Sequence, residues 1–384
     1  QFASSAASDV YKRQMRLSAE KSNQSPSWRF VGWGGLISGL LILSFYSVLA
    51  GICLDYIFIS GTDSGGMSTT EKFASQTASV SKLLFWHTAF ILMNIIIIGA
   101  GVVSGIERIV RLLMPMLFVL MIVMVVNSII NGDFARGLSF LFAPNFSDVT
   151  PATFLSAMGQ AFFSLSLGMG SIMCYGAYMP KDENVFNTSL TVCGLDTLIA
   201  IMAGLAIFPI IFAYGLEPDA GPSLVFISLL SVFWDMPFGN FIGPVVFILL
   251  SVAALSSSIS LLEPSVAFLS EEKIFSRKSA SIILGLIAWF LGIGSLLSFN
   301  LWSEVNIIGD LNFLNSMDFL ANQFLMPLGG MFVAIFAGWF LSTKIIKEEL
   351  EPGQKKIFIV WKFFIKFISP TLVAFIFINQ LFFS

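Results

Sequence analysis

A short stretch of the chain, Gly159–Gly170, places polar and glycine residues inside an otherwise apolar run. It contains a glutamine and two serines, Ser164 and Ser166, followed by Gly168 and Gly170. Glycine lowers helix stability by about 1 kcal/mol relative to alanine, so the pair beside the serines favours a local unwinding. Irregular backbone at membrane depth is tolerated only where it lines a cavity. The alternative interpretation is that the glycines permit close helix packing.

A carboxylate and a row of hydroxyl groups occur in two later apolar stretches. Asp196 lies inside the stretch 188–214. An unpaired ionisable residue in hydrocarbon costs at least about 2.5 kcal/mol, so it indicates a functional site unless it reaches headgroup water. In the stretch 240–269, small residues recur at helical spacing and share one face, which is either a binding face or a packing face. The members of this face are Ala253, Ser256, Ser257, Ser260 and Leu261.

Together these side chains offer hydroxyl, carbonyl and carboxylate oxygens without a set of thiolates or imidazoles. Such ligands suit a hard cation such as sodium and do not suit zinc or iron. Where a helix is interrupted, its first half ends in carbonyl groups that attract a cation or an ammonium group. Its second half begins with amide groups that attract a carboxylate. A zwitterion fits both ends of such a break.

These groups must be positioned by membrane helices. Of the 384 residues, 56% are hydrophobic and 11% charged, with a mean hydropathy of +0.87, whereas about a quarter of a soluble domain is charged. The chain is therefore predicted to be an all-α integral membrane protein in the lipid bilayer. Its 20 basic and 23 acidic residues leave no basic excess for a nucleic-acid partner. The three cysteines lie in apolar stretches and are interpreted as packing residues.

Nine stretches are long and apolar enough to cross a bilayer. They cover residues 30–59, 83–103, 108–130, 153–179, 188–214, 240–269, 279–299, 318–342 and 356–382. With nine spans the two ends of the chain lie on opposite faces. Most basic residues of the connections fall on the side where the chain starts, and the other side holds only Lys72, Lys82 and Arg136. The positive-inside rule therefore predicts a cytoplasmic start and an outer C-terminus, in a multi-pass protein of the cell membrane. Longer outer loops are expected at 60–82 and 215–239, and Glu217–Pro222 and Trp234–Pro237 in the second suggest short ordered elements.

The start of the chain is set apart from this domain. Residues 1–14 show neither helical periodicity nor the form of a signal peptide, and they resemble a sequencing or assembly scar. Residues 15–29 are expected to form a polar, basic cytoplasmic loop. Residues 30–382 then form a single transmembrane domain.

From about Trp28 to the C-terminus, the chain resembles the neurotransmitter:sodium symporters, specifically their bacterial amino-acid transporters with the LeuT-type inverted-repeat fold. The stretches that carry the resemblance are Leu41–Val48, Gly159–Gly170 with Tyr175–Tyr178 following, Ala203–Pro209, Ser256–Pro264 and Leu297–Trp302. The resemblance implies that the nine spans correspond to the family's third to eleventh. It implies a truncated first repeat over 30–131, a complete second repeat over 152–342 and an extra last span over 356–382.

The resemblance also implies roles for single residues. The substrate would meet Ile42, Tyr46, Phe163, Ser164, Ser166, Met169, Ser257 and Leu261. The sodium ligands would be Ser164 and Asp196 at the first site, and Ala253, Ser256 and Ser257 at the second. Phe163 would act as a lid and Asp318 as the acidic half of an outer gate, while Glu271 would belong to an inner gate.

Asp196 stands where many relatives of that family have an asparagine. Two sodium ions beside a zwitterion need a compensating anion at low dielectric, and the fixed charge of Asp196 would do what chloride does in animal relatives. The resemblance thus implies a chloride-independent, sodium-coupled amino-acid symporter that works by alternating access, without an organic cofactor. Ile42, Phe163, Met169 and Leu261 offer no charged partner, so an apolar or aromatic amino acid is expected.

The family's first two spans, which supply ligands to both sodium sites, have no counterpart here, so the chain is interpreted as a fragment that is inactive without them. A sodium-binding channel or sensor of the same fold remains an alternative. An intramembrane hydrolase that uses Asp196 and the serines is a weaker alternative. An aspartyl mechanism needs a second carboxylate, but Glu263 lies toward the inner end of its span. A serine mechanism needs a base, but His87 belongs to a distant span. The sequence does not determine which amino acid is carried or the oligomeric state.

Overall fold

The structure is a computed structural model that describes residues 12–62, 65–143, 145–180, 183–218, 221–349 and 355–382. Within these ranges the chain is helical apart from turns, connecting segments and one two-stranded hairpin. Eight of its helical stretches are long and apolar enough to cross a membrane. They are Pro26–Ile59, Val80–Gly99, Ser104–Asn131, Val185–Ala213, Gly239–Glu271, Arg277–Leu297, Phe313–Phe340 and Phe358–Phe375.

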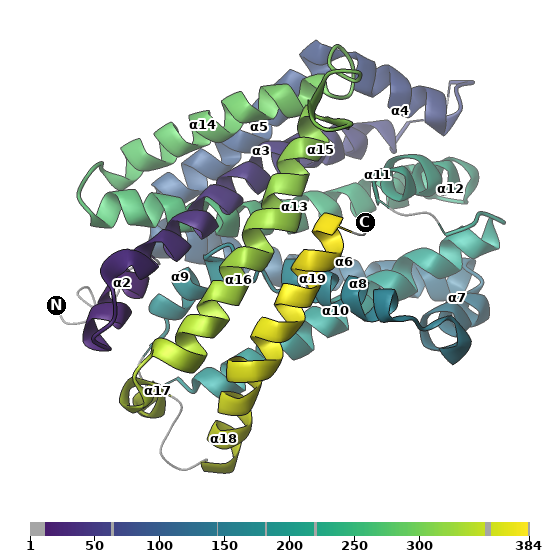
Figure 1. Cartoon of the computed structure of the whole chain (residues 1–384). Coiled ribbons are helices and arrows are strands. Elements are labelled where there is room, and N and C mark those ends of the chain that lie inside the picture. The colour runs from purple at the N-terminus through teal and green to yellow at the C-terminus, as the bar shows by residue number, and fades with distance from the viewer. Residues whose placement is uncertain are drawn as a thin grey trace.

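The helices of the first half of the chain alternate between long spans and short surface elements (Figure 1). They are α2 (Lys12–Lys21), η1 (Pro26–Trp28), α3 (Arg29–Ile59), α4 (Thr69–Ala78), α5 (Val80–Gly99), η2 (Val102–Glu107), α6 (Arg108–Asn131), α7 (Phe134–Phe142), η3 (Phe146–Asp148), α8 (Pro151–Ser164), α9 (Ser171–Ala177) and α10 (Val185–Ala213).

The second half continues this alternation and adds the hairpin β1–β2. Its elements are α11 (Gly221–Ser223), η4 (Leu224–Ser228), α12 (Leu229–Asp235), α13 (Gly239–Glu271), α14 (Arg277–Leu297), β1 (Asn306–Ile308), β2 (Leu311–Asn312), α15 (Phe313–Asp318), η5 (Phe319–Leu325), α16 (Met326–Ile335), η6 (Phe336–Phe340), α17 (Thr343–Glu349), α18 (Lys355–Phe363), η7 (Phe364–Ile368) and α19 (Ser369–Phe382). The strands pair antiparallel.

Eight of the nine predicted spans correspond to continuous helical stretches. The exception is the predicted span 153–179, which is divided into α8 and α9 with a non-helical segment between them. Its interruption, rather than a lack of apolar residues, keeps this span from forming a single long helix.

Helices α3 and α13 pack against each other along the centre of the bundle, with α5 and α14 beside α3 (Figure 1). Their close approach depends on Gly39 of α3, where an added Cβ would lie 2.8 Å from the backbone carbonyl oxygen of Leu261. A side chain at this position would therefore push α3 and α13 apart. Because α3 carries Tyr46 and α13 carries the serine face, this contact brings together two parts of the predicted site.

Two elements near the ends of the bundle differ from the sequence-based expectations. Residues 15–29 were expected to be a loop, but they contain most of helix α2 and the 3-10 turn η1. Met15 and Ala19 of α2 are buried against Phe336, and this tertiary packing explains why a polar, basic segment is helical. Of the predicted scar, residues 1–11 lie outside the described residues, and 12–14 form the start of α2.

The predicted outer loops contain ordered helices. Segment 60–82 includes α4, which begins with a capping box between Ser68 and Glu71. Segment 215–239 includes a short apolar helical stretch, Gly221–Asp235, whose residues Phe226 and Phe233 are buried in a cluster with Phe247 of α13. The expectation of short ordered elements in segment 215–239 is therefore confirmed, whereas no residues of segment 60–82 were used to predict α4. The hairpin β1–β2 had no sequence-based prediction.

Candidate functional site

The centre of the site is the interruption between α8 and α9. Helix α8 ends at Ser164, and Ser166, Gly168 and Gly170 have backbone φ angles of +54°, +82° and +83°. An L-residue helix cannot continue through several left-handed positions, so the chain unwinds there, as predicted. An added Cβ at Gly168 would lie 2.3 Å from the carbonyl oxygen of Met326. The unwound backbone therefore lies directly against α16.

A hydrogen bond joins the end of α8 to helix α10. The hydroxyl of Ser164 donates to Oδ2 of Asp196 at 3.0 Å. The carboxylate is partly exposed, and Ser164 supplies the side-chain hydrogen bond that the structure describes for it. The prediction that Asp196 lies beside the broken helix, rather than facing lipid far from Ser164, is therefore confirmed. The pair presents hydroxyl and carboxylate oxygens next to the last carbonyl groups of α8.

The serine face of α13 borders a separate cavity of about 710 Å³. Ser256, Ser257 and Ser260 line it together with Tyr175 and Tyr178 from the region of α9. This arrangement shows that the serine face is turned toward open space over at least part of its length.

Hydrogen bonds fix the rotation of this face. The hydroxyl of Ser256 donates to the carbonyl oxygen of Ala253 at 2.9 Å. On the far side, the buried hydroxyl of Ser258 donates to Oδ1 of Asn94 in α5 at 2.7 Å. Because Ser258 is held by α5, the adjacent Ser257 is turned away from α5.

An apolar cluster lies between α3, the unwound segment and α13. Ile42, Met169 and Leu261 are buried in it, and Tyr46 packs against it. These are four of the eight residues predicted to meet the substrate. The cluster's described members are aliphatic and aromatic residues, with the Tyr46 hydroxyl as a polar group at its edge.

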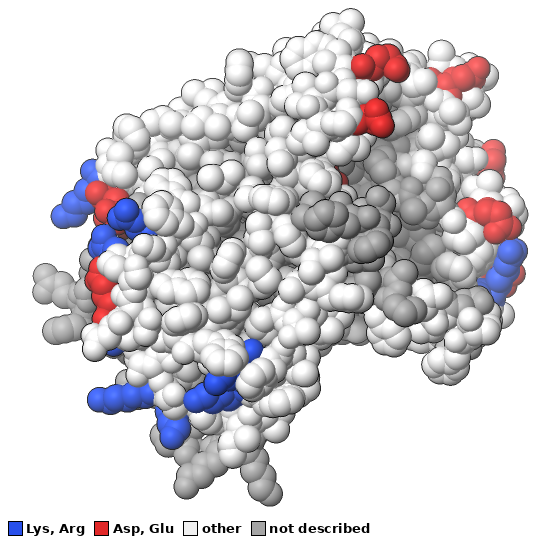
Figure 2. Space-filling model, in the orientation of Figure 1, with Lys and Arg blue, Asp and Glu red and all other residues white. Residues whose placement is uncertain are grey.

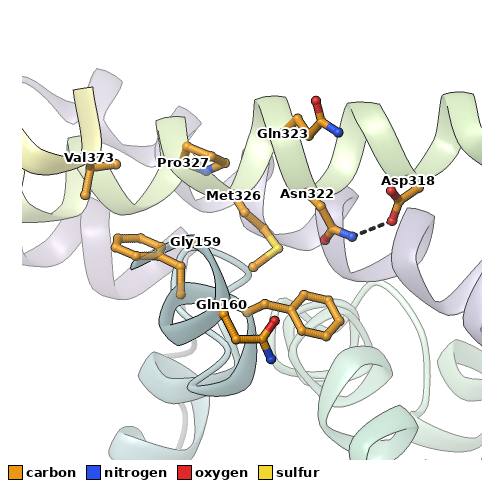
Figure 3. A pocket seen from close by; sticks show the side chains of 10 residues that line it. Gly159, Gln160, Asp318, Asn322, Gln323, Met326, Pro327 and Val373 are labelled. Atoms are coloured by element: carbon orange, nitrogen blue, oxygen red, sulfur yellow. Dashed lines mark hydrogen bonds between the residues drawn. The ribbon is translucent and has the colours of Figure 1, made fainter. Parts of the chain in front are cut away.

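Phe163 and Asp318 line a different cavity, of about 320 Å³, between α8 and the α15–α16 span. Figure 3 shows Gln160 on α8 opposite Asp318 and Asn322, with Met326 reaching from α16 toward α8. The amide of Asn322 donates to Oδ1 of Asp318 at 2.6 Å. The two residues predicted for the outer gate are thus brought to one cavity.

The remaining predicted residues lie apart from these groups. Ser166 lines an apolar cavity of about 250 Å³ between the unwound segment and the α16 and α19 helices. Glu271 lies at the C-terminal end of α13, away from the cavity of Phe163 and Asp318. Among the described residues, no hydrogen bond joins the Ser164–Asp196 pair to Ser256 or Ser257, so the predicted sodium ligands form two separate groups.

One polar cluster was not predicted. Glu263, in the C-terminal half of α13, is fully buried and accepts hydrogen bonds from the Tyr178 hydroxyl at 3.0 Å and from Arg277 Nη2. The Nε of Arg277 donates to the carbonyl oxygen of Ile98 at 2.9 Å. A glutamate inside an apolar span is the signal from which the sequence could have indicated this cluster. Its hydrogen-bond partners come from other helices, so the sequence alone could not identify them. His87 lies in yet another place, with Nε2 3.1 Å from the carbonyl oxygen of Trp289.

Comparisons with known proteins bear directly on this arrangement. The model of the sodium:neurotransmitter symporter family matches residues 70–383. An uncharacterized sodium-dependent transporter of Bacillus subtilis, YhdH, is 34% identical over 380 residues, covering 97% of this chain and 82% of its own length. An uncharacterized sodium-dependent transporter of Haemophilus influenzae is 36% identical over 369 residues, covering 93% of this chain and 80% of its own length.

A solved structure is also similar. The crystal structure of MhsT in complex with L-phenylalanine has 39% sequence identity and a TM-score of 0.87, with 98% of this chain and 87% of that chain covered. This likeness confirms the predicted LeuT-type helical bundle. The family match and the relatives together show that the chain belongs to the sodium:neurotransmitter symporter family, and that it is a multi-pass, sodium-dependent membrane transporter and not an enzyme.

Proposed function

We propose that the protein is a chloride-independent symporter that couples sodium to the uptake of an apolar or aromatic amino acid. The observation that carries this proposal is the hydrogen bond between Ser164 and Asp196 at the interruption between α8 and α9. It combines a carboxylate and a hydroxyl group beside the carbonyl end of a helix, and such oxygen atoms are ligands that a hard cation prefers.

Two groups of oxygen atoms are proposed to bind sodium. The first is Ser164 with Asp196, and the second is the carbonyl oxygen of Ala253 with the hydroxyls of Ser256 and Ser257. The 2.9 Å contact between Ser256 and the Ala253 carbonyl supports the second group, because it places two oxygens on the same side of α13.

The proposed substrate follows from the apolar cluster. Ile42, Met169 and Leu261 would surround the side chain of the amino acid, and the Tyr46 hydroxyl would bind its carboxylate. A charged side chain would lose its hydration in such a cluster without gaining a partner. The L-phenylalanine bound to MhsT supports an aromatic or large apolar substrate. The remaining four substrate contacts, Phe163, Ser164, Ser166 and Ser257, stay proposals on the resemblance alone.

Chloride independence is proposed from the position of Asp196. A fixed carboxylate beside the first sodium group would balance positive charge that otherwise needs a mobile anion. Replacing chloride by gluconate is therefore expected to leave uptake unchanged.

Alternating access would be controlled at both ends of the bundle. Phe163 and Asp318, which share the cavity of about 320 Å³, are proposed as the outer gate, and Glu271 as part of the inner one. Figure 2 shows Lys and Arg mostly over the end of the molecule where α2, α17 and α18 lie, and Asp and Glu mostly over the opposite end. This asymmetry supports a cytoplasmic start of the chain and an outer C-terminus.

The decisive experiment is uptake by the full-length protein in proteoliposomes. Labelled phenylalanine, tryptophan, leucine and lysine would be offered with an inward sodium gradient or an equal potassium gradient. We expect accumulation of the first three only, and only with sodium. Uptake that persists in potassium would overturn sodium coupling, and preferred uptake of lysine would overturn the substrate class. A sodium flux that does not depend on amino acid would instead favour a channel.

A further inference from the structure

A group of lysine side chains gathers at one end of the bundle, where η6 and α17 meet α18 and η7. Between residues 343 and 366 the sequence has six lysines and three glutamates. Figure 2 shows Lys and Arg side chains over this end of the molecule. The sodium and substrate groups described above use none of these residues.

Lys366 is held against an aromatic ring. Its Nζ lies 3.9 Å from the ring centroid of Trp339 and 5.5 Å from that of Phe367. The indole nitrogen of Trp339 donates to the backbone carbonyl of Lys366 at 2.9 Å. The ammonium group is therefore fixed at the level of Trp339, one residue before the end of η6. The ring face attracts the ammonium group but does not neutralise its charge.

Two further lysines lie around a second ring. Lys347 Nζ and Lys362 Nζ are 5.7 and 5.8 Å from the ring centroid of Phe358. Lys362 also donates to the hydroxyl of Thr343 at 3.2 Å. Lys362 and Lys366 are four residues apart, so they lie on one side of the helix. The three ammonium groups of Lys347, Lys362 and Lys366, which we call the lysine cluster, thus lie at one end of the bundle.

The lysine cluster lacks a described acidic partner. The ion pairs among the described side chains involve Arg16, Arg111, Arg136 and Arg277. The rings beside the cluster are partly open, because Trp339, Phe363 and Phe367 are each about half exposed. Exposed tryptophan and phenylalanine next to lysine at the end of apolar helices are typical of the membrane–water boundary.

We propose that the lysine cluster binds the headgroup of an anionic phospholipid. The phosphate would accept hydrogen bonds from the ammonium groups, which supplies the negative charge that the described protein side chains do not. The exposed rings of Trp339, Phe363 and Phe367 would contact the glycerol backbone and the upper acyl chains. This second contact distinguishes a lipid from a soluble phosphate, which would meet only the lysines.

The proposal predicts selective retention of phosphatidylglycerol over phosphatidylcholine. The full-length protein would be purified from nanodiscs containing equal amounts of both lipids, without sodium or amino acid, and the bound lipids counted by native mass spectrometry. The test variant is Lys347→Gln with Lys362→Gln and Lys366→Gln. The control removes the same charge at three lysines outside the segment 343–366, with Lys72→Gln, Lys273→Gln and Lys278→Gln.

We expect the test variant to lose at least about tenfold in phosphatidylglycerol affinity, or ~1.4 kcal/mol, while the control stays near the unmodified protein. Equal retention in the test variant would overturn the proposal, and so would equal losses in test and control. Full displacement by soluble glycerol phosphate would overturn the assignment to a lipid. Trp339→Leu removes the ring beside Lys366 and keeps all three charges, so a smaller loss of phosphatidylglycerol affinity is expected. Since no transport is measured, failure of sodium coupling would not affect the result.

Discussion

Two carboxylates within the helical bundle, Asp196 and Glu263, have different surroundings. Glu263 is fully buried and is bonded by Tyr178 and Arg277, so its charge is balanced by protein. Asp196 is partly exposed and is bonded by Ser164. A buried charge that loses its partner strongly destabilises the protein, whereas a partly exposed carboxylate can remain without a charged partner. Glu263 is thus suited to holding helices together, and Asp196 to binding a mobile cation.

The serines of α13 repeat this contrast on a smaller scale. Ser258 is buried and bonded to Asn94, whereas its neighbour Ser257 borders the cavity of about 710 Å³. We therefore expect Ser258 to contribute to stability and the adjacent Ser257 to contribute to binding. The predictions below test this separation, starting with the largest effect.

Arg277→Ala is expected to destabilise the full-length protein by about 3 kcal/mol, because Glu263 would remain buried without a balancing charge. Thermal unfolding in detergent measures this effect. Arg277→Lys keeps the charge but loses the guanidinium geometry, so a smaller loss is expected. An unchanged melting temperature in Arg277→Ala would show that Glu263 is not a structural carboxylate.

Ser258→Ala is expected to cost about 2 kcal/mol of stability, because Oδ1 of the buried Asn94 loses its donor. The matched variant Ser257→Ala should leave the melting temperature nearly unchanged. Instead, it should weaken the stabilisation of the protein by sodium, measured as the shift in melting temperature with sodium concentration. The opposite pattern would contradict the assignment of roles on α13.

Asp196→Asn is expected to weaken sodium binding about tenfold, or ~1.4 kcal/mol, because the fixed charge is removed. Sodium-dependent binding of labelled phenylalanine measures this loss. Chloride should restore part of the affinity in the variant and have no effect on the unmodified protein. Glu304→Gln, on the exposed segment before β1, serves as the control and should match the unmodified protein.

The smallest effect is expected at Glu71, a carboxylate that is bonded but fully open to water. The backbone N–H of Ser68 donates to it and lowers the pKa of Glu71, with help from the Ser68 hydroxyl. The capping box therefore stabilises α4 above the ordinary pKa of a glutamate, and this contribution is lost as pH falls through the lowered value. The protection factors of the amides in Thr69–Ala78, taken relative to the intrinsic exchange rate at each pH, should fall at acid pH, and Glu71→Gln should remove that dependence.

The sequence was most informative where a single residue type departed from its surroundings. Glycines and serines in an apolar run predicted the interruption after Ser164, and a lone carboxylate in another run predicted the partner at Asp196. Both signals are local, because membrane helices do not tolerate such groups without a reason. The positions of the eight continuous spans followed from length and hydropathy in the same way.

Features that depend on tertiary contacts were not predictable. Helix α2 is buried against Phe336, more than 300 positions along the chain, and no local pattern indicates that contact. The Glu263–Arg277–Tyr178 cluster joins residues from separate elements, so the partners of Glu263 could not be named from sequence. The binding and gating roles of all the site residues, Ser166, Ala253 and Glu271 among them, stay predictions, since they derive from the family resemblance.

The contact between Gly168 and α16 affects how the transporter can move. Backbone atoms of the unwound segment lie against Met326 and Gly330 with no room for even a methyl group between them. The same continuous helical stretch, Phe313–Phe340, carries Asp318 toward its opposite end. A shift of the unwound segment must therefore either move this helical stretch with it or slide over it, so a rearrangement beside Ser164 and Asp196 is mechanically linked to the position of Asp318.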